Sequence, residues 1–487
     1  MSRFNPFRVT RPALLCAAAA LLLAGCPDRA SQPQPKKDKT AKPNQPLTVL
    51  IVDDAELGQA VAREWRSRTE EDLKIEPVSA AQLAAAHRLP GDAIIFPSGL
   101  LGHLAERELI LPIDPAALEE PGFDYRDIFE LLRRQEMRWG KRTFAAPLGS
   151  PQLLLAYRAD IFARLGLSPP ADWKAYQELV VRLADRSLAG EPASVDRQWQ
   201  STIEPLAEGW AGQMLLARAA PYALHRDQVS PLFQYDSLTP LIDQPPYVRA
   251  LRELKAAATS GSFAERRMMP AEAMTALRAG SCAMAICWPA ANNRDSKIDD
   301  LAGSREIRFA PLPGSRQAYR FATKTWEPRA ADESPHVPLL SVAGRLAAVT
   351  SSTAVPARAQ SLVLWLAGRE VSSLVAPHAA STTLFRHSQV ASAGRWTGNL
   401  PADAAQHYGN LVAQTLMLPR AFPALRLPGR EQYLAALDTA VHDAIRGGGD
   451  PQAALAKARE RWQEITEQLG EASQKKANAR SLGEEGQ

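Results

Sequence analysis

Polar side chains stand directly after short apolar runs in this amino-acid sequence. Asp53 and Asp54 follow one such run, and Ser98 and Gly99 follow or end another. Carboxylates and hydroxyls at these positions can form hydrogen bonds with a small polar molecule. The same residue types also cap helices and form turns, so both roles stay open for these four residues.

Aromatic side chains offer a second kind of contact. Trp288 ends an apolar run, with Asn292 shortly after it, and Trp210 follows Glu208-Gly209. An aromatic ring packs on the C–H face of a sugar, and the sugar hydroxyls need hydrogen-bond partners once they leave water. The residue types favour a carbohydrate site formed by Asp53, Asp54, Ser98, Gly99, Tyr157, Trp210, Trp288, Asn292 and Trp326. For Trp288 the alternative is packing between two parts of the protein.

Catalytic and metal-binding patterns are missing from the sequence. It contains no Gly-x-Ser-x-Gly, His-Glu-x-x-His or Gly-x-x-x-x-Gly-Lys motif, and its eight histidines are scattered. The adjacent side chains of Asp53 and Asp54 would point apart at a strand end. We therefore expect no enzyme activity, no metal and no cofactor. Cys282 and Cys287 would lie about 16 Å apart in a strand, too far for a disulfide.

The candidate residues belong to an alternating pattern of strands and helices. Apolar runs at 47–52, 73–78 and 92–98 predict strands, and the amphipathic stretches 57–68 and 80–87 predict the helices between them. This βαβαβ order is typical of a doubly wound α/β sheet. Ligands of such sheets bind at the carboxyl ends of the strands, where Asp53, Asp54, Ser98 and Gly99 stand.

The N-terminus has the pattern of an export signal. Three arginines precede an apolar stretch of roughly a dozen residues, which is too short for the ~20-residue helix that spans a bilayer. The stretch ends in Leu23-Ala24-Gly25-Cys26, which resembles the bacterial lipobox. The resemblance implies that residues 1–25 are removed and that Cys26 is acylated.

A polar segment follows the predicted lipid anchor. Residues 27–46 contain proline, lysine, glutamine and serine with almost no apolar residue, so they cannot bury enough surface to fold. As a flexible coil they would reach on the order of 25 Å. We expect residues 26–46 to be a tether that holds a folded body near a membrane.

The composition of the chain is that of an ordinary globular protein. The chain has 487 residues, of which 46% are hydrophobic and 23% are charged, and three positive charges of its net +4 lie in the predicted signal segment. This charge balance does not suggest a nucleic-acid partner. Its length suggests two or more lobes.

One passage carries a specific family resemblance. The sequence 153–162 ends an apolar strand in Tyr157-Arg158 and continues with Asp160-Ile161-Phe162, then Gly166-Leu167, a proline pair and Asp172-Trp173. It resembles the bacterial extracellular solute-binding proteins of the sugar-binding type. Asp172 is a good helix N-cap, and Trp173, Tyr176, Leu179, Val180 and Leu183 form one apolar helix face that predicts core packing. Passages at 274–289, 307–314, 340–366 and 427–451 extend the resemblance.

The resemblance implies a two-lobed α/β fold of the periplasmic-binding-protein type II. The lobes would exchange segments, with 47–148 and 313–370 in one lobe and 149–312 and 371–470 in the other. Residues 471–487 are expected to be a disordered tail. Residues 190–199 and 324–338 look like surface insertions relative to the family.

The resemblance also implies a function in solute capture. Such a protein closes its lobes on a small solute, here a carbohydrate, and delivers it to the permease of an ABC transporter. We expect an exported, lipid-anchored monomer of the cell envelope. Two alternatives stay open: a sensor or scaffold subunit that is not coupled to transport, and a lipid-anchored hydrolase.

Overall fold

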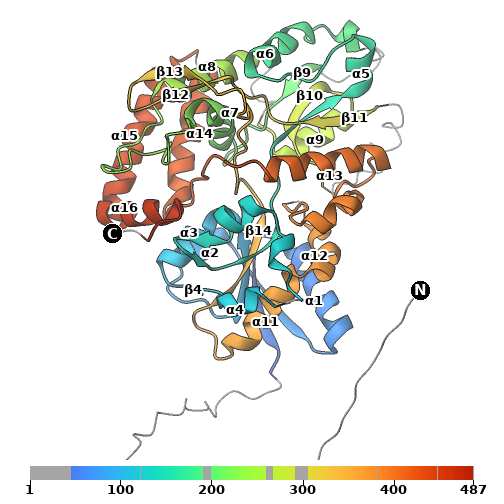
Figure 1. The fold of residues 1–487 in the computed structure, drawn as a ribbon, viewed down its shortest axis with the longest axis vertical. Helices are drawn as coiled ribbons and strands as arrows, with labels where there is room; N and C mark the ends of the chain where they lie inside the picture. The colour runs from blue at the N-terminus through green and yellow to red at the C-terminus, as the bar shows by residue number, and fades with distance from the viewer. Residues whose placement is uncertain are drawn as a thin grey trace, which may run out of the picture. The chain divides into compact units, whose positions relative to one another are not determined.

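The fold is known from a computed structural model, which describes residues 45–120, 122–189, 199–258, 267–290, 305–379, 381–446 and 448–485. Two sheets with covering helices make up most of this part of the chain (Figure 1). The predicted signal segment, Cys26, Asn292 and nearly all of the 190–199 insertion lie outside the described residues.

The first sheet has six strands and contains the predicted βαβαβ unit. Its strands are β1 (Leu47–Val52), β2 (Leu73–Val78), β3 (Ala93–Pro97), β4 (Ile110–Leu111), β7 (Ala146–Gly149) and β14 (Arg345–Thr350). β1 pairs in parallel with β2 and β3, whereas β14 runs antiparallel to β3, β4 and β7. Apart from Thr48, β1 and β3 are apolar, as is typical of strands covered on both faces.

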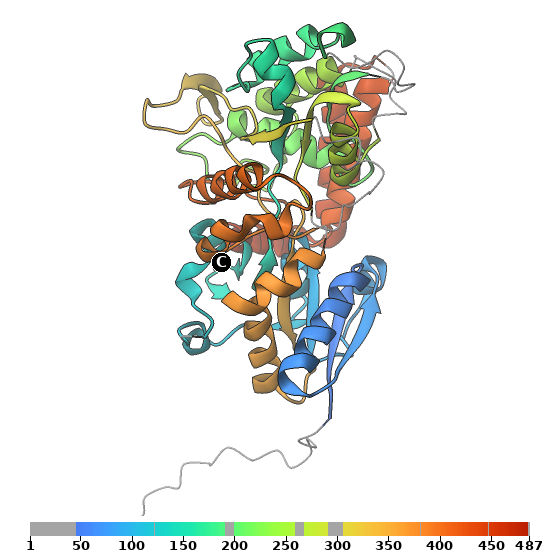
Figure 2. The same ribbon diagram turned by 90° about the vertical axis from the view of Figure 1, so that its right-hand side faces the viewer.

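Helices cover both faces of the six-stranded sheet. They are α1 (Ala55–Thr69), α2 (Ala80–Ala85), α3 (Leu101–Glu106), α4 (Pro115–Leu118), α11 (Pro356–Ala367) and α12 (Arg369–Val375). Local sequence explains where they begin, since Asp54 caps α1 and Ser79 forms a capping box with Gln82 at α2. The segments α1 (blue) and α12 (orange), distant in sequence, lie side by side (Figure 2).

The second sheet has four strands in the order β11, β8, β10, β9. Their bounds are β8 (Leu154–Arg158), β9 (Gln200–Ile203), β10 (Cys282–Cys287) and β11 (Ile307–Ala310). β9 and β10 are parallel, and β8 is antiparallel to both of its neighbours. Cys282 and Cys287 are both buried in β10 with free thiols.

The helices of the second part include α5 (Ala159–Arg164), α6 (Trp173–Arg182), α7 (Ala211–Ala223), α8 (Pro245–Ala258) and α9 (Pro270–Arg278). The prediction for α6 is confirmed: the Asp172 carboxylate accepts a hydrogen bond from the Ala175 amide, and the predicted apolar face is buried. Local capping and a 3.6-residue periodicity were sufficient to predict this helix.

Helices predominate in residues 387–481. They are η8 (His387–Trp396), α13 (Ala402–Leu416), α14 (Arg430–Arg446), α15 (Pro451–Leu469) and α16 (Glu471–Ser481). Helix α13 packs against β11, and α14 packs against α7 and α15. The expected disordered tail instead includes α16, whose Arg480 forms an ion pair with Glu106. The segment is polar, and its composition alone does not reveal the specific contacts that order α16.

Two hairpins complete the described structure. β5 (Arg138–Trp139) pairs with β6 (Arg142–Thr143), and β12 (Gln317–Arg320) pairs with β13 (Thr325–Pro328). Of these strands, β13 lies within the 324–338 region. None of the helices in the described parts of the chain is long and apolar enough to cross a membrane.

Candidate functional site

Strand register brings four polar residues to one edge of the six-stranded sheet. Asp53 and Asp54 follow β1, and Ser98 follows β3. Because β14 is antiparallel to β3, with Arg345 opposite Pro97, the beginning of β14 lies at the same edge. Arg345 is also opposite Gly149, the last residue of β7. The edge therefore collects the carboxyl ends of β1, β3 and β7.

Register also defines the corresponding edge of the four-stranded sheet. Cys287, at the end of β10, lies opposite Leu154, at the start of β8. Trp288 follows β10 and Glu204 follows β9, so both stand at this edge. Only five residue steps join Gly149 of the first sheet to Leu154 of the second, and they span at most about 18 Å. The two edges are therefore near each other.

A second passage joins the same two edges. β11 ends at Ala310, which lies opposite Leu155 near the start of β8, and β14 begins at Arg345. The intervening residues 311–344 carry the β12–β13 hairpin. The two passages therefore connect the same two edges.

The Asp54 carboxylate has two partners at the first edge. One oxygen accepts a hydrogen bond from the Leu57 amide at 3.1 Å, and the other lies 3.3 Å from Nε of Arg345. Both side chains are largely buried. Burial lowers the pKa of Arg345, and the Asp54 charge partly offsets that shift. Asp54 thus acts as a helix cap and as the counter-ion of Arg345.

Asp53 and Ser98 also have protein partners. The Asp53 carboxylate accepts from the Ala80 amide at 3.1 Å, while its side chain stays exposed. The Ser98 hydroxyl donates to the Ala343 carbonyl at 3.1 Å, and its amide donates to Gly344. Of these two, Asp53 has the more accessible polar group.

Gly99 makes a close contact that the sequence did not predict. A Cβ atom at this position would lie 2.5 Å from Nε of Arg430, the first residue of α14. The Arg430 Nη2 donates to Oε1 of Gln213 in α7 at 3.3 Å. Arg430 therefore links the edge of the first sheet to the first turn of α7. No motif in the sequence relates Arg430 or Gln213 to Gly99, so neither residue was predicted to belong to the site.

Trp210 and Trp288 form an aromatic pair on the side of the second sheet. Their ring centroids are 5.5 Å apart, and the rings are tilted by 46°. Trp288 is 7% exposed, whereas Trp210 is only partly buried. Trp288 packs on Trp210 within the same part of the chain, so this contact does not decide between ligand binding and packing between two parts of the protein.

Asp438 of α14 holds the turn that carries Trp210. Its two carboxylate oxygens accept hydrogen bonds from the amides of Gly209 and Gly212, both at 2.6 Å. Burial raises the pKa of Asp438, and these two hydrogen bonds oppose that shift. A side chain of α14, which no sequence pattern indicated, thus holds the turn before α7 in place.

Two predicted site residues lie away from the edges. Tyr157 stands toward the far end of β8, opposite Met284 and Arg308, and packs on Phe162 with 4.7 Å between ring centroids. Burial raises its pKa. The structure therefore does not bring Tyr157 to the edge that begins β8.

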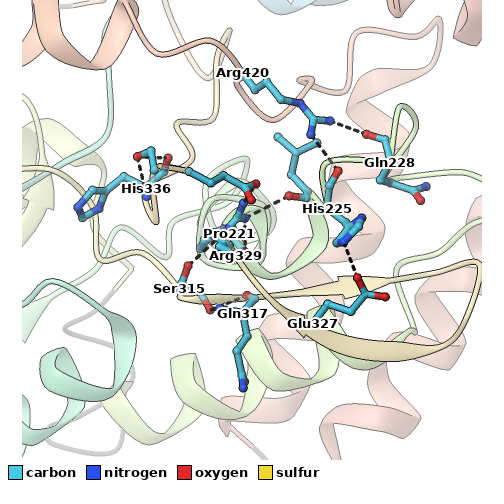
Figure 3. Close-up of polar contacts among 12 residues, drawn as sticks. Pro221, His225, Gln228, Ser315, Gln317, Glu327, Arg329, His336 and Arg420 are labelled. Atoms are coloured by element: carbon cyan, nitrogen blue, oxygen red, sulfur yellow. Dashed lines mark hydrogen bonds and ion pairs between the residues drawn. The ribbon is translucent and has the colours of Figure 1, made fainter. Parts of the chain in front are cut away.

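Trp326 lies on the β12–β13 hairpin rather than at a strand edge. Its ring packs on Tyr319 and Tyr222, with centroids 5.3 and 5.9 Å apart. Arg329 of the same region donates to the carbonyls of Pro221 and Leu224 (Figure 3). The hairpin is thus docked on the C-terminal end of α7, whereas Trp210 precedes its N-terminal end. Asn292 lies outside the described residues.

Glu136 joins the two passages between the sheets. Its Oε1 accepts from the Ser150 hydroxyl at 2.8 Å and from the amide and hydroxyl of Ser341 at 2.8 and 3.1 Å. Ser150 belongs to the first passage and Ser341 to the second. The side chain is fully buried, and this burial raises its pKa against the effect of the hydrogen bonds. No sequence pattern pointed to Glu136.

A buried ion pair lies behind the edge of the second sheet. Glu204 pairs with Arg218 of α7, and the guanidinium lies 3.9 Å from the ring centroid of Trp173. The Tyr176 hydroxyl donates to Glu204 at 3.1 Å. These groups stabilise the position of the edge. Within the described residues, no group of three His, Cys, Asp or Glu side chains has the geometry of a metal site.

Comparison with solved structures shows the same fold. A solute-binding protein of an ABC transporter from Agrobacterium radiobacter K84, in complex with ribitol, matches with a TM-score of 0.65 and 18% identity over 86% of this chain and 98% of its own. A solute-binding protein from Agrobacterium vitis S4 with bound D-mannitol matches with a TM-score of 0.62 and 15% identity, and the match covers 87% of this chain and 99% of its own. Maltose-bound MalE3 from T. maritima matches with a TM-score of 0.59 and 14% identity, and the match covers 86% of this chain and 99% of its own.

The neighbours are two-lobed binding proteins, so the predicted fold class is confirmed. No curated protein matches the sequence. Residues 52–372, which are more than half of the chain, match the family described as bacterial extracellular solute-binding protein. This family consists of binding proteins, not enzymes. The chain belongs to the family of bacterial extracellular solute-binding proteins.

Proposed function

We propose that this protein captures a polyol or a small sugar between its two lobes and delivers it to the permease of an ABC transporter. The observation that carries the proposal is the Trp210–Trp288 pair at a sheet edge that adjoins the polar edge of the other sheet. Capture by closure requires contacts that exist only when both edges meet the solute.

The chemistry of the two edges suits a polyhydroxylated solute. Tryptophan rings pack on C–H faces, while hydroxyl groups need both donors and acceptors. Arg430 supplies donors and Asp53 supplies acceptors. A solute that combines apolar faces with hydroxyls would match this set better than a purely ionic one.

Related structures support the same ligand class. The three neighbours hold ribitol, D-mannitol and maltose. Their identity to this chain is 18% or less, so the support comes from the shared fold. A linear polyol or a mono- or disaccharide is therefore the first class to test.

The proposal includes a location and a division into lobes. We place the lipid on Cys26, with the polar segment 26–46 as a tether, so that a monomeric body works near the permease. We assign 47–148 and 313–370 to one lobe and 149–312 and 371–470 to the other, with α16 as an ordered addition. Mass spectrometry of membrane-extracted protein would detect the acyl chains on Cys26.

The central test is the binding of defined solutes. Ribitol, D-mannitol and maltose should each be titrated into the purified protein while its melting temperature is recorded, since a ligand stabilises by RT ln(1 + [L]/Kd). Trp288→Ala should weaken binding of the active solute by about tenfold or more, because truncating a central aromatic contact costs about 2 kcal/mol. Trp288→Phe should retain part of the affinity.

Trp326→Ala is the matched control, because Trp326 is also a partly buried tryptophan in aromatic contacts but lies on the hairpin. It should leave the affinity unchanged. Unchanged binding in Trp288→Ala would contradict the site, and the absence of a thermal shift with sugars and polyols at millimolar concentration would contradict the ligand class.

A further inference from the structure

A cavity lies apart from the two strand edges. It has a volume of about 200 Å³ and is formed by residues of η3 (Leu132–Glu136), β5, the loop after α7, the segments before β14 and after α13, and the end of α16. A water molecule takes up roughly 30 Å³ in the liquid, so the cavity has room for a polyatomic ion. Trp210, Trp288, Gly99 and Arg430 do not line it.

Five arginines line this cavity: Arg134, Arg138, Arg420, Arg426 and Arg480. None of the lining residues within the described ranges is acidic. Two of the five have carboxylate partners elsewhere, since Arg134 pairs with Glu130 and Arg480 pairs with Glu106. The other three form no ion pair with a described carboxylate, although the charges of Glu333 and Asp227 act on Arg420 and that of Glu136 acts on Arg426. Because none of these carboxylates lines the cavity, its wall carries an excess of positive charge.

Arg426 is the deepest of the three and is only 4% exposed. Its guanidinium donates to the carbonyls of Glu136 and Arg138, both at 3.4 Å, and of Ser481 at 3.2 Å. These hydrogen bonds are long, and carbonyls do not neutralise a charge. Burial lowers the pKa of Arg426 to about 10, and the nearby Glu136 carboxyl partly offsets the effect.

Arg420 reaches the cavity from the segment after α13. Its Nη1 donates to the His225 carbonyl at 3.0 Å and its Nη2 to the Gln228 carbonyl at 2.7 Å (Figure 3). Arg138 donates from Nη2 to the Lys141 carbonyl at 2.6 Å. In both cases the hydrogen bonds hold the guanidinium in place and leave other N–H groups without a described carboxylate. Fixed guanidinium groups lose little entropy when they bind an anion.

We propose that this arginine-lined cavity binds a phosphate group, either as inorganic phosphate or as a small phosphate monoester. A tetrahedral dianion accepts hydrogen bonds from several guanidinium groups at once and offsets the excess charge. Apolar lining residues such as Leu224, Leu340 and Leu482 limit the space beside the charged wall. The cavity is separate from the proposed solute site, so phosphate and the solute would be able to bind at the same time.

The site can be tested by calorimetric titration of the purified protein with sodium phosphate, against sodium chloride at equal ionic strength. Saturable binding of one phosphate is expected. The double variant Arg138→Gln/Arg420→Gln should weaken it at least tenfold, whereas Arg142→Gln on the neighbouring strand β6 should not. Titration with glycerol phosphate separates the two sources, because tighter binding than that of phosphate indicates a monoester.

A second variant tests the location without removing charge. Ala424→Trp places a large side chain in the cavity and should abolish phosphate binding while thermal unfolding stays cooperative. Full phosphate affinity in Ala424→Trp or in the double arginine variant would overturn the proposal. Loss of phosphate binding in Arg430→Gln alone would also overturn it, since that result would place the anion at the strand edges.

Discussion

Arg430 lies against Gly99 so closely that a Cβ atom on residue 99 would be 2.5 Å from its Nε and 2.9 Å from its Cζ. Gly99 comes two residues after the end of β3 in the first sheet. Arg430 begins α14, which packs on α7. The missing side chain of Gly99 therefore sets how closely the guanidinium approaches the strand edge.

Gly99→Ala should displace Arg430 and weaken solute binding. The side chain of Arg430 is flexible, so we expect a stability loss of no more than about 1 kcal/mol and a larger relative loss of solute affinity, about tenfold. Urea denaturation and calorimetric titration measure the two effects. Gly122→Ala is the control, since a Cβ there meets nothing within 4 Å. Equal solute affinity in both variants would show that Arg430 does not contribute to binding.

Asp54→Ala should be strongly destabilising. The substitution removes the cap of α1, which contributes about 1 kcal/mol, and leaves Arg345 buried without its counter-ion. We expect a total loss of about 3–5 kcal/mol in the free energy of unfolding. Asp114→Ala removes a comparable cap at α4 with no ion pair and should cost about 1 kcal/mol. Similar losses in both variants would show that the Arg345 pair adds nothing.

Glu136 should make stability depend on pH. Burial raises its pKa in the folded protein, so the native state holds this proton more tightly than the unfolded state. Its contribution to stability is present below the unfolded pKa and is lost as the pH rises through the folded pKa. The free energy of unfolding of Glu136→Gln relative to the parent protein should therefore rise from pH 4 to pH 8. A difference that stays constant over this range would contradict the raised pKa.

Removal of residues 470–487 should destabilise the folded body. Helix α16 contributes the Arg480–Glu106 ion pair, the hydrogen bond from the Gly140 amide to the Arg480 carbonyl and buried alanines. We expect a loss of about 2–4 kcal/mol in urea denaturation, in line with several lost contacts. Removal of 486–487 alone serves as the control. An unchanged stability after the longer truncation would restore the prediction of a disordered tail.

Elements that depend on local sequence were predictable. The bounds of β1 and β2 agree with the predicted strands, and Asp450-Pro451 begins α15 as capping rules predict, with the Asp450 carboxylate accepting from the Ala453 amide. In these cases periodicity and caps within a few residues determine the structure. The family resemblance supplied the arrangement of the two sheets, which local patterns do not contain.

The candidate site was predictable only in part. Asp53, Asp54, Ser98 and Gly99 reach one edge because strand ends are readable from sequence. The contact between Gly99 and Arg430 depends on how α14 packs, and no local pattern encodes it. Tyr157 is near the end of an apolar strand, as Asp53 and Ser98 are, but β8 is antiparallel to β10 and β11. The end of β8 therefore lies at the opposite edge of its sheet, and this direction is set by strand pairing.

Glu136 is hydrogen-bonded to both polypeptide passages that connect the sheets, through Ser150 and Ser341. One carboxylate thus fixes two crossing points of the chain to a single spot in the interior. A rotation of one sheet against the other would have to bend the chain in these two passages, beside Ser150 and Ser341. Trp288 and Gly99 stand near the strand edges that the passages join, so they would move less than the parts of the sheets that lie farther away.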